Sequence, residues 1–273
     1  MAPTPIAPER ARSLARWNRF LSIAHFVQFV AMLAVSKTDV RFAPNVPTIK
    51  PIIENGTFAG IEQTAVVLLD IPLAYLIATF FLMSAIAHFL AGWPLRSRYE
   101  AWLARGIQPL RWVEYAFSST VMIVAIAYIS FITDFPALIA IAIANASMNL
   151  FGWSMEAANE GRLARGERID WKHFIFGCIS GAAPWLAIFS VLWAFSAQEG
   201  LPAEASIPGF VYAIIAILFI SFNIFAITMV LQYRQVGRWR DYLVGEKTYM
   251  ILSLAAKTLL AWQVWSGTLR DLG

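Results

Sequence analysis

One lysine lies in the middle of an apolar segment, where a charged side chain is costly. Lys257 belongs to the run Ser-Leu-Ala-Ala-Lys-Thr-Leu-Leu-Ala-Trp at 253–262, and its nearest basic neighbours along the chain are Lys247 and Arg270. On a helix with a rise of ~1.5 Å per residue, the ammonium lies roughly 15 Å or more from either neighbour. A lysine at this depth faces a partner or a cavity. The chemistry open to it is an ion pair, or attack of its amine on a carbonyl group.

Glu114 is the carboxylate best placed to be that partner. It lies roughly 13 Å into its own apolar run when helix rise is counted from Arg105, and this depth matches that of Lys257 to within about one turn. Other carboxylates lie nearer the ends of their runs, namely Asp70, Asp134 and Glu156. Two interpretations stay open. The pair is either a buried salt bridge that fixes helix packing, or a Schiff base between the lysine and an aldehyde, with Glu114 as counterion of its protonated form.

The composition indicates that membrane-spanning helices position these two residues. Of 273 residues, 59% are hydrophobic and only 14% are charged, compared with roughly 25% charged residues in a soluble domain. The basic residues are scattered in short clusters, whereas a nucleic-acid-binding protein needs one basic patch. Runs long enough to span a ~30 Å hydrocarbon core predict seven helices, near 17–36, 64–92, 108–132, 136–157, 172–197, 207–232 and 248–269. We expect an all-α membrane protein, a seven-transmembrane-helix bundle that forms a single domain over residues 1–273.

The positive charges predict how the chain is oriented. Cytoplasmic flanks of membrane helices are enriched in Lys and Arg. With seven spans, one side of the membrane holds most of them: Arg10, Arg12, Arg16, Arg19, Arg96, Arg98, Arg105, Arg111, Arg162, Arg165, Arg168, Lys172, Arg234, Arg238, Arg240 and Lys247. The other side holds Lys37, Arg41, Lys50 and Arg270. We therefore expect a multi-pass protein of the cell membrane, with a cytoplasmic N-terminus and an extracellular C-terminus.

The first extracellular loop, residues 37–63, is expected to contain a short β-hairpin. Asn55-Gly56 lies between β-prone residues in the segment 52–58, and Asn-Gly favours the two-residue turns of hairpins. Asn55-Gly56-Thr57 is also a glycosylation sequon, an alternative that matters only in a eukaryotic secretory host.

Aromatic residues surround the expected position of Lys257. The predicted fifth, sixth and seventh helices contribute Pro184, Trp185, Phe219, Phe222, Phe225 and Trp262. Each aromatic side chain taken singly is typical of helix packing. Their number around one lysine favours a pocket for a long conjugated ligand.

Polar side chains gather near the depth of Glu114, towards the cytoplasm. His25 and His88 lie at similar depths when helix rise is counted from their basic flanks, and Ser84 and Ser118 lie one turn from His88 and Glu114. These side chains are expected to form a polar pocket, joined directly or through water. Each histidine alone also fits a buried imidazole with satisfied hydrogen bonds.

Several strings taken together resemble the heliorhodopsins. They are Leu110-Arg111-Trp112-Val113-Glu114-Tyr115 with Ser118-Ser119, Asn145-Ala146-Ser147-Met148 with Phe151-Gly152-Trp153, Pro208-Gly209-Phe210-Val211-Tyr212, Leu231-Gln232-Tyr233 and Ser253-Leu254-Ala255-Ala256-Lys257. The similarity runs from about His25 to Thr268. It implies a bundle of rhodopsin type that binds all-trans retinal on Lys257, with Glu114 as sole counterion, and that forms homodimers. It also implies a slow sensory photocycle, in which light isomerises all-trans retinal to 13-cis, and no enzymatic activity.

The resemblance also gives each candidate site residue an expected role. Ser253 and Ser118 would hydrogen-bond the Schiff base. The proton-accepting polar cluster would be His25, His88, Ser84 and Tyr115, and the retinal pocket would include Met148, Trp185, Phe222, Asn145 and Trp262. We expect no catalytic residue and no metal site. The expected partners are retinal, membrane lipid and an unidentified cytoplasmic signalling partner, and no nucleic acid.

The sequence favours transient internal proton transfer over net pumping. An outward proton pump of the common microbial type has a second carboxylate near the Schiff base, whereas Ser253 stands in that place here, one turn before Lys257. Ala125 stands where such a pump has a carboxylate donor. Two alternatives stay open. One is a light-driven or light-gated proton transporter on the same scaffold, and the other is a retinal-free transporter that uses Lys257 and Glu114 for coupling.

Overall fold

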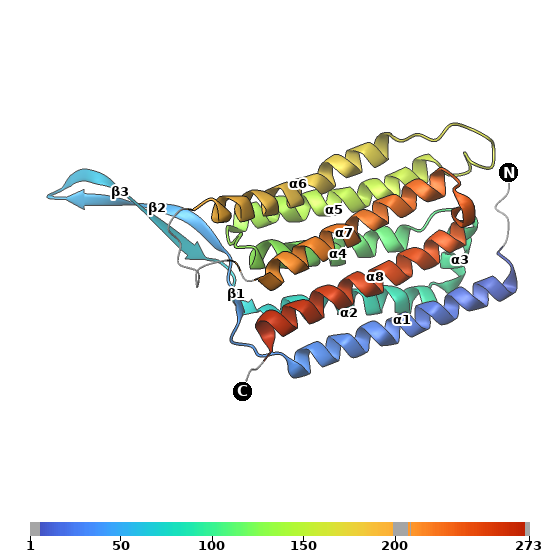
Figure 1. The fold of residues 1–273 in the computed structure, drawn as a ribbon, viewed down its shortest axis with the longest axis horizontal. Helices are drawn as coiled ribbons and strands as arrows, with labels where there is room; N and C mark the ends of the chain where they lie inside the picture. Colours follow the sequence, from blue (N-terminus) through green and yellow to red (C-terminus); the bar gives the residue numbers. More distant parts are fainter. Residues whose placement is uncertain (1–5, 199–206, 208, 271–273) are drawn as a thin grey trace.

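The computed structural model describes residues 6–198, 207 and 209–270, and in these residues the chain is mostly helical. Seven long helices form a bundle (Figure 1): α1 (Pro8–Val35), α2 (Leu73–Gly92), α4 (Pro109–Ile129), α5 (Phe135–Ala158), α6 (Lys172–Ser196), α7 (Gly209–Tyr233) and α8 (Tyr242–Val264). The short helix α3 (Arg96–Ala104) joins α2 to α4, η2 (Gly237–Arg240) precedes α8, and η3 (Trp265–Leu269) follows it. The predicted helical membrane bundle is confirmed.

The helix α8 differs in composition from the other long helices. Among the described residues, 6 helices are long and apolar enough to cross a membrane, and they are α1, α2, α4, α5, α6 and α7. The helix α8 has a similar length but carries Glu246, Lys247 and Lys257. Its charged residues therefore need partners inside the bundle, and the site described below supplies them.

Three helices begin at residues that differ from the starts predicted from the apolar runs. The second helix was expected from 64, but residues up to Val67 form a strand and α2 begins at Leu73. The first begins at Pro8 rather than near 17, because the buried Leu14 packs in an apolar cluster with Tyr99 and Leu103. The last begins at Tyr242 rather than 248, where the Asp241 carboxylate accepts a hydrogen bond from the Leu243 N–H (3.0 Å) and caps the helix. Pro208, part of one string that resembles the heliorhodopsins, lies outside the described residues.

The β-hairpin is confirmed and is longer than the sequence indicated. Strands β2 (Asn45–Glu54) and β3 (Thr57–Val67) pair antiparallel, and they extend well beyond the expected segment 52–58. Asn55 and Gly56 form the turn with positive φ angles of 50° and 78°, which is the geometry that favours Asn-Gly. The short strands β1 (Arg41–Phe42) and β4 (Ile71–Pro72) pair at the base of the hairpin. In Figure 1 the hairpin projects from one end of the bundle.

Neighbouring helices enclose one large apolar core. The most extensive packing is between α1 and α2, between α5 and its neighbours α4 and α6, and between α2 and α4, and α7 packs against α8. The largest cluster of buried side chains includes Ile77, Ile123, Ile188, Leu218 and Leu260, drawn from α2, α4, α6, α7 and α8. The core therefore joins helices from both halves of the chain, and it holds Lys257 and Glu114 at fixed positions on α8 and α4.

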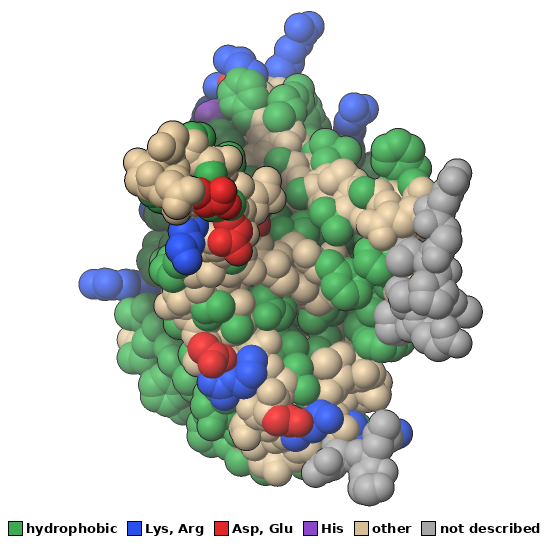
Figure 2. Space-filling view, turned by 90° about the vertical axis from the view of Figure 1, so that its left-hand side faces the viewer, with side chains coloured by type: hydrophobic (Ala, Val, Ile, Leu, Met, Phe, Trp, Pro, Cys, Tyr) green, Lys and Arg blue, Asp and Glu red, His purple; other side chains and the backbone are tan. Residues whose placement is uncertain are grey.

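The two ends of the bundle differ in charge. Figure 2 looks onto the hairpin end, where charged side chains form a few small groups among hydrophobic and uncharged ones. At the base of the hairpin, Arg41 pairs with Asp70, with 2.7 Å between Nε and Oδ1. The start of α1, the helix α3 and the segment η2 lie at the opposite end (Figure 1) and are rich in arginine. The structure thus gathers most of the basic residues of the loops at the end where α1 begins.

Candidate functional site

Lys257 and Glu114 lie side by side in the core. The Lys257 side chain is 2% exposed, and its Nζ is 3.3 Å from Oε1 of Glu114. Nζ also donates a hydrogen bond to Oγ of Ser253 (2.8 Å), one turn earlier on α8. The ring of Tyr115 faces the ammonium, with 5.3 Å from Nζ to the ring centroid, a distance at which the ring attracts a cation. The depth match between the two helices therefore corresponds to direct contact.

One serine hydroxyl binds the Glu114 carboxylate, and a second serine lies close to it. The Ser84 hydroxyl on α2 donates a 2.6 Å hydrogen bond to Oε1 of Glu114, the length expected for a hydroxyl and an ionised carboxylate. Ser118 is fully buried one turn after Glu114, and its hydroxyl makes no hydrogen bond with the described residues. Glu114 thus has a cation and a hydroxyl donor, and Ser118 is close along the same helix.

The two predicted histidines meet beside this pair. The rings of His25 on α1 and His88 on α2 stack, with 5.6 Å between centroids and 4° between planes. His88 Nδ1 is 2.8 Å from Oδ1 of Asn18. Since the Asn18 amide nitrogen donates to the Leu14 carbonyl, its Oδ1 is the acceptor and His88 carries a proton on Nδ1. His25 is fully buried, and neither of its ring nitrogens has a partner in the described part of the chain.

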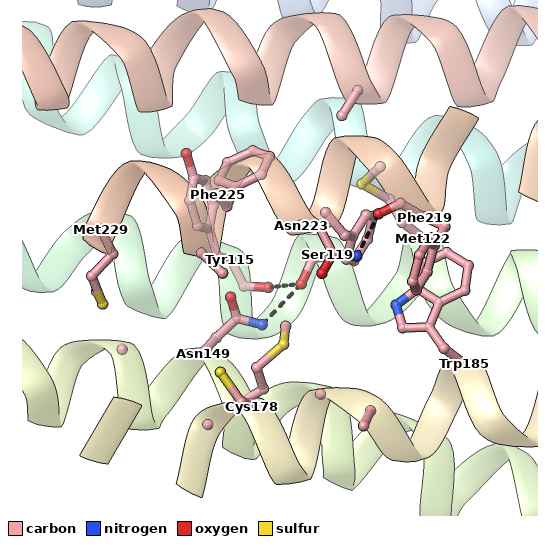
Figure 3. Close-up of a pocket in the computed structure, with 18 of the residues that line it drawn as sticks. Tyr115, Ser119, Met122, Asn149, Cys178, Trp185, Phe219, Asn223, Phe225 and Met229 are labelled. Carbon is pink, nitrogen blue, oxygen red and sulfur yellow. Dashed lines mark hydrogen bonds between the residues drawn. The ribbon is translucent and has the colours of Figure 1, made fainter. Parts of the chain in front are cut away.

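An apolar cavity of about 410 Å³ begins at Lys257 and extends between α4, α5, α6 and α7. Figure 3 shows its wall, with Trp185 at one side and Tyr115 and Phe225 at another. Three residues predicted to form the pocket line it: Met148, Trp185 and Phe222. The Trp185 ring meets the Phe222 ring edge to face, with 5.6 Å between centroids. The volume lies within the ~300–1,000 Å³ of small-molecule sites.

Two other predicted pocket residues do not line this cavity. Asn145 lies behind its wall, where its amide nitrogen donates to the Ser119 hydroxyl (2.8 Å). Trp262 points elsewhere, and its indole N–H donates to Oε1 of Gln28 on α1 (3.2 Å). At 3.6 residues per turn, a residue five positions after Lys257 is rotated well away from it around α8. The prediction that Trp262 lines the pocket rested on its proximity to Lys257 in the sequence. The rotation around α8 instead turns its side chain towards Gln28 on α1.

The sequence reasoning missed a second buried ionic group. Arg111, counted there among the basic loop residues, is buried and lies between the carboxylates of Glu156 and Glu246, forming an ion pair and hydrogen bonds with both. A signal for it was present, because Arg111 precedes Glu114 by three positions on one helix and so shares its inward face. The site therefore contains two charged clusters, not one.

The arrangement around Lys257 is suited to holding an aldehyde covalently. A primary amine condenses with an aldehyde to form an imine and water, and Glu114 is placed to neutralise the imine when it is protonated. The adjoining cavity is long and apolar, and the side of it formed by α5 and α6 includes Gly152, Gly177 and Gly181. At Gly152 and Gly181 the absence of a side chain lets the Trp112 ring and the Met148 side chain pack directly against the helix backbone. These residues fit a long, apolar, conjugated aldehyde attached to Lys257.

Comparison with known proteins identifies the family of the chain. No curated protein matches the sequence. The sequence profile of the heliorhodopsins, which are retinal-binding rhodopsins of the membrane, matches residues 14–269. The match includes Lys257, Glu114 and the helices that carry them, and it covers almost the whole chain. The chain therefore belongs to the heliorhodopsin family.

Proposed function

We propose that this protein is a light-sensing photoreceptor with all-trans retinal bound to Lys257 as a protonated Schiff base. Membership of the family implies a retinal chromophore, and the observation that carries the assignment is the Lys257–Glu114 pair at the end of a long apolar cavity. When bound, retinal supplies a conjugated chain that absorbs visible light and isomerises to 13-cis. We expect no enzymatic activity.

The protein's own side chains hold the charge of that linkage. Glu114 serves as counterion, with its position fixed by the hydrogen bond from Ser84. Ser253 is within hydrogen-bonding distance of the Lys257 nitrogen, and Ser118 is close by on α4. In light, the proton leaves the Lys257 nitrogen transiently, is first accepted by the polar cluster of His25, His88, Ser84 and Tyr115, and stays inside the protein.

The distribution of charge supports the proposed orientation. Basic residues at the end where α1 begins would face the cytoplasm under the positive-inside rule, and the hairpin end would lie outside. We also propose a homodimer, as the family resemblance implies, and a signalling partner that binds the cytoplasmic end. The homodimer rests on the family resemblance, and the signalling partner rests on the proposed sensory role.

Binding of all-trans retinal to Lys257→Ala tests the assignment. The purified wild-type protein should form a visible absorption band when all-trans retinal is added, and Lys257→Ala should form none. Lys247→Ala is the matched control, because it removes a lysine from the same helix outside the cavity. A visible band of normal intensity in Lys257→Ala would show that retinal is attached elsewhere.

A further inference from the structure

The Arg111 cluster has more negative than positive side chains. Arg111 forms ion pairs with Glu156 and Glu246, and all three side chains are at most 5% exposed. The guanidinium also lies over the rings of Trp112 and Tyr249, at 5.0 and 4.2 Å from their centroids. One guanidinium neutralises only one of two carboxylates. The cluster can therefore bind one further proton, which would bring its net charge to zero.

The hydrogen bonds distinguish the two carboxylates. Glu156 accepts from Arg111, from the Trp112 indole (2.7 Å), from the Gln108 backbone N–H (2.8 Å) and from the Tyr242 hydroxyl (3.0 Å). So many donors stabilise the ionised form of a carboxylate. Among the described residues, Glu246 accepts from Arg111 and, at 2.9 Å, from the Tyr99 hydroxyl, and from no third donor. Glu246 is therefore the carboxylate that a proton would neutralise at lower cost.

A small polar cavity connects Glu246 with the Lys257 site. Its volume is about 30 Å³, which is enough to hold a water molecule. Its wall includes Glu246, Arg111 and Gln108 on one side and His88 and Glu114 on the other. Both charged clusters of the core thus border one polar space.

Two buried polar atoms at this cavity lack partners among the described residues. They are Oε1 of Gln108, whose side chain is 3% exposed, and Nε of Arg111. A buried acceptor without a partner is costly, and Oε1 of Gln108 is suited to accept a hydrogen bond from a protonated carboxyl or from a water beside it. The groups that face Glu246 are thus Tyr99, Arg111, Gln108, Asn18, His88, Glu114 and Tyr115.

We propose that Glu246 takes up the proton that the Lys257 nitrogen releases in light, and holds it until the dark state returns. The inference rests on the proposed function and deepens it. The N–H bond at Lys257 breaks, an O–H bond forms at Glu246, and no other bond changes. His88 lies on the way, because it lines the same cavity as Glu114 and Glu246. Its Nδ1 proton points to Asn18, so Nε2 is the ring nitrogen that would accept a proton and pass it on.

Light-induced difference infrared spectroscopy of the full-length, retinal-loaded protein in lipid tests the proposal. In wild type, a carbonyl band of a protonated carboxyl should rise as the visible band is lost, and it should shift downward in D₂O. In Glu246→Gln this band should be absent, while the dark visible spectrum, which reports a folded pigment, stays unchanged.

Two further variants keep the test decisive. Glu160→Gln is the surface control and should retain the band, because a hydrogen bond from Arg105 lowers the pKa of the Glu160 carboxyl and keeps it ionised. If Glu246→Gln does not fold, Tyr99→Phe should shift the band frequency, since it removes the hydrogen bond to Glu246. A band that persists in Glu246→Gln, or is unmoved in Tyr99→Phe, overturns the proposal. A wild-type protein that forms no visible pigment would instead refute the retinal assignment itself.

Discussion

Lys257 is stable in the core only because its neighbours compensate its charge. A lysine at the centre of a membrane costs ~2.5–3.5 kcal/mol on insertion scales. Glu114 at 3.3 Å and Ser253 at 2.8 Å supply an opposite charge and a hydrogen-bond acceptor. Removing one member of such a buried pair leaves the other uncompensated, at a cost of about 3–5 kcal/mol. The same contacts that allow burial of the amine also prepare a counterion for its protonated imine.

Replacing Glu114 with Gln should therefore destabilise the protonated pigment. An opposite charge within ~4–6 Å stabilises a protonated group by about 1–3 pH units. The visible band of Glu114→Gln should give way to a near-ultraviolet band at a pH lower by about that amount than in wild type. A spectroscopic pH titration of both proteins measures it. Glu160→Gln, which alters a carboxylate outside the bundle, should titrate like wild type, and an unshifted Glu114→Gln curve would assign the counterion to another group.

Single residues differ in how well the sequence predicts their positions. Counting helix rise from charged flanks was enough to pair Glu114 with Lys257, because both lie on regular helices that cross the same membrane. It failed for Arg111, which was counted with the loops although its side chain turns inward to Glu156 and Glu246. Membrane depth follows from position in the sequence, whereas side-chain direction depends on rotation around the helix and on the neighbouring helices.

Helix ends in this protein depend on capping residues as well as on apolar length. At the start of α5, Oδ1 of Asp134 accepts a 2.7 Å hydrogen bond from the Ala137 N–H, and a proline lies in the first turn. Both features satisfy or remove backbone donors that the helix cannot pair internally. They explain why α5 begins close to the hairpin base rather than continuing from α4.

Loss of this cap should lower the stability of the whole protein. Replacing an N-cap Asp with Ala typically costs about 0.5–2 kcal/mol, so Asp134→Ala should unfold at a lower temperature than wild type. Thermal unfolding of the detergent-purified protein, followed by circular dichroism, measures the difference. Asp134→Asn retains a capping oxygen and should unfold near the wild-type temperature. Equal destabilisation by Asn and Ala would show that the charge of Asp134, rather than its hydrogen bond, matters.

The hairpin shows that hydropathy alone does not distinguish an apolar strand from the start of a membrane helix. The apolar run predicted for the second helix included residues that instead pair with β2, among them Thr64, Val66 and Val67. β-Branched residues are enriched in strands, and this local signal indicated the correct structure where the average over the run did not. The Asn55-Gly56 turn was predictable because its backbone conformation requires positive φ angles. The strand length was not, since it depends on pairing between distant residues.

Across the whole molecule, polar and titratable side chains are distributed unevenly around Lys257. Towards the end where α1 begins lie the two charged clusters and the two histidines. Towards the hairpin end, the core contains fully buried apolar side chains, including Ile123, Ile126, Leu260 and Val264. Tyr128 is the ionisable residue at the hairpin end of α4, and its hydroxyl is held by the Ala43 N–H (3.0 Å) and the Arg41 carbonyl (3.2 Å). A proton released at Lys257 therefore has acceptors on one side of the bundle.

This asymmetry predicts that light moves protons within the protein but not across the membrane. Net transport needs proton-conducting groups on both sides of the Schiff base, and the apolar half of the core has no such chain among the described residues. Retinal-loaded protein in lipid vesicles should therefore show loss and recovery of the visible band under illumination, with no sustained pH change in the medium. A protonophore supplies the control, since it abolishes any pH change that comes from transport. A sustained light-driven pH change that the protonophore removes would identify a proton transporter, and the apolar half would then have to open during the photocycle.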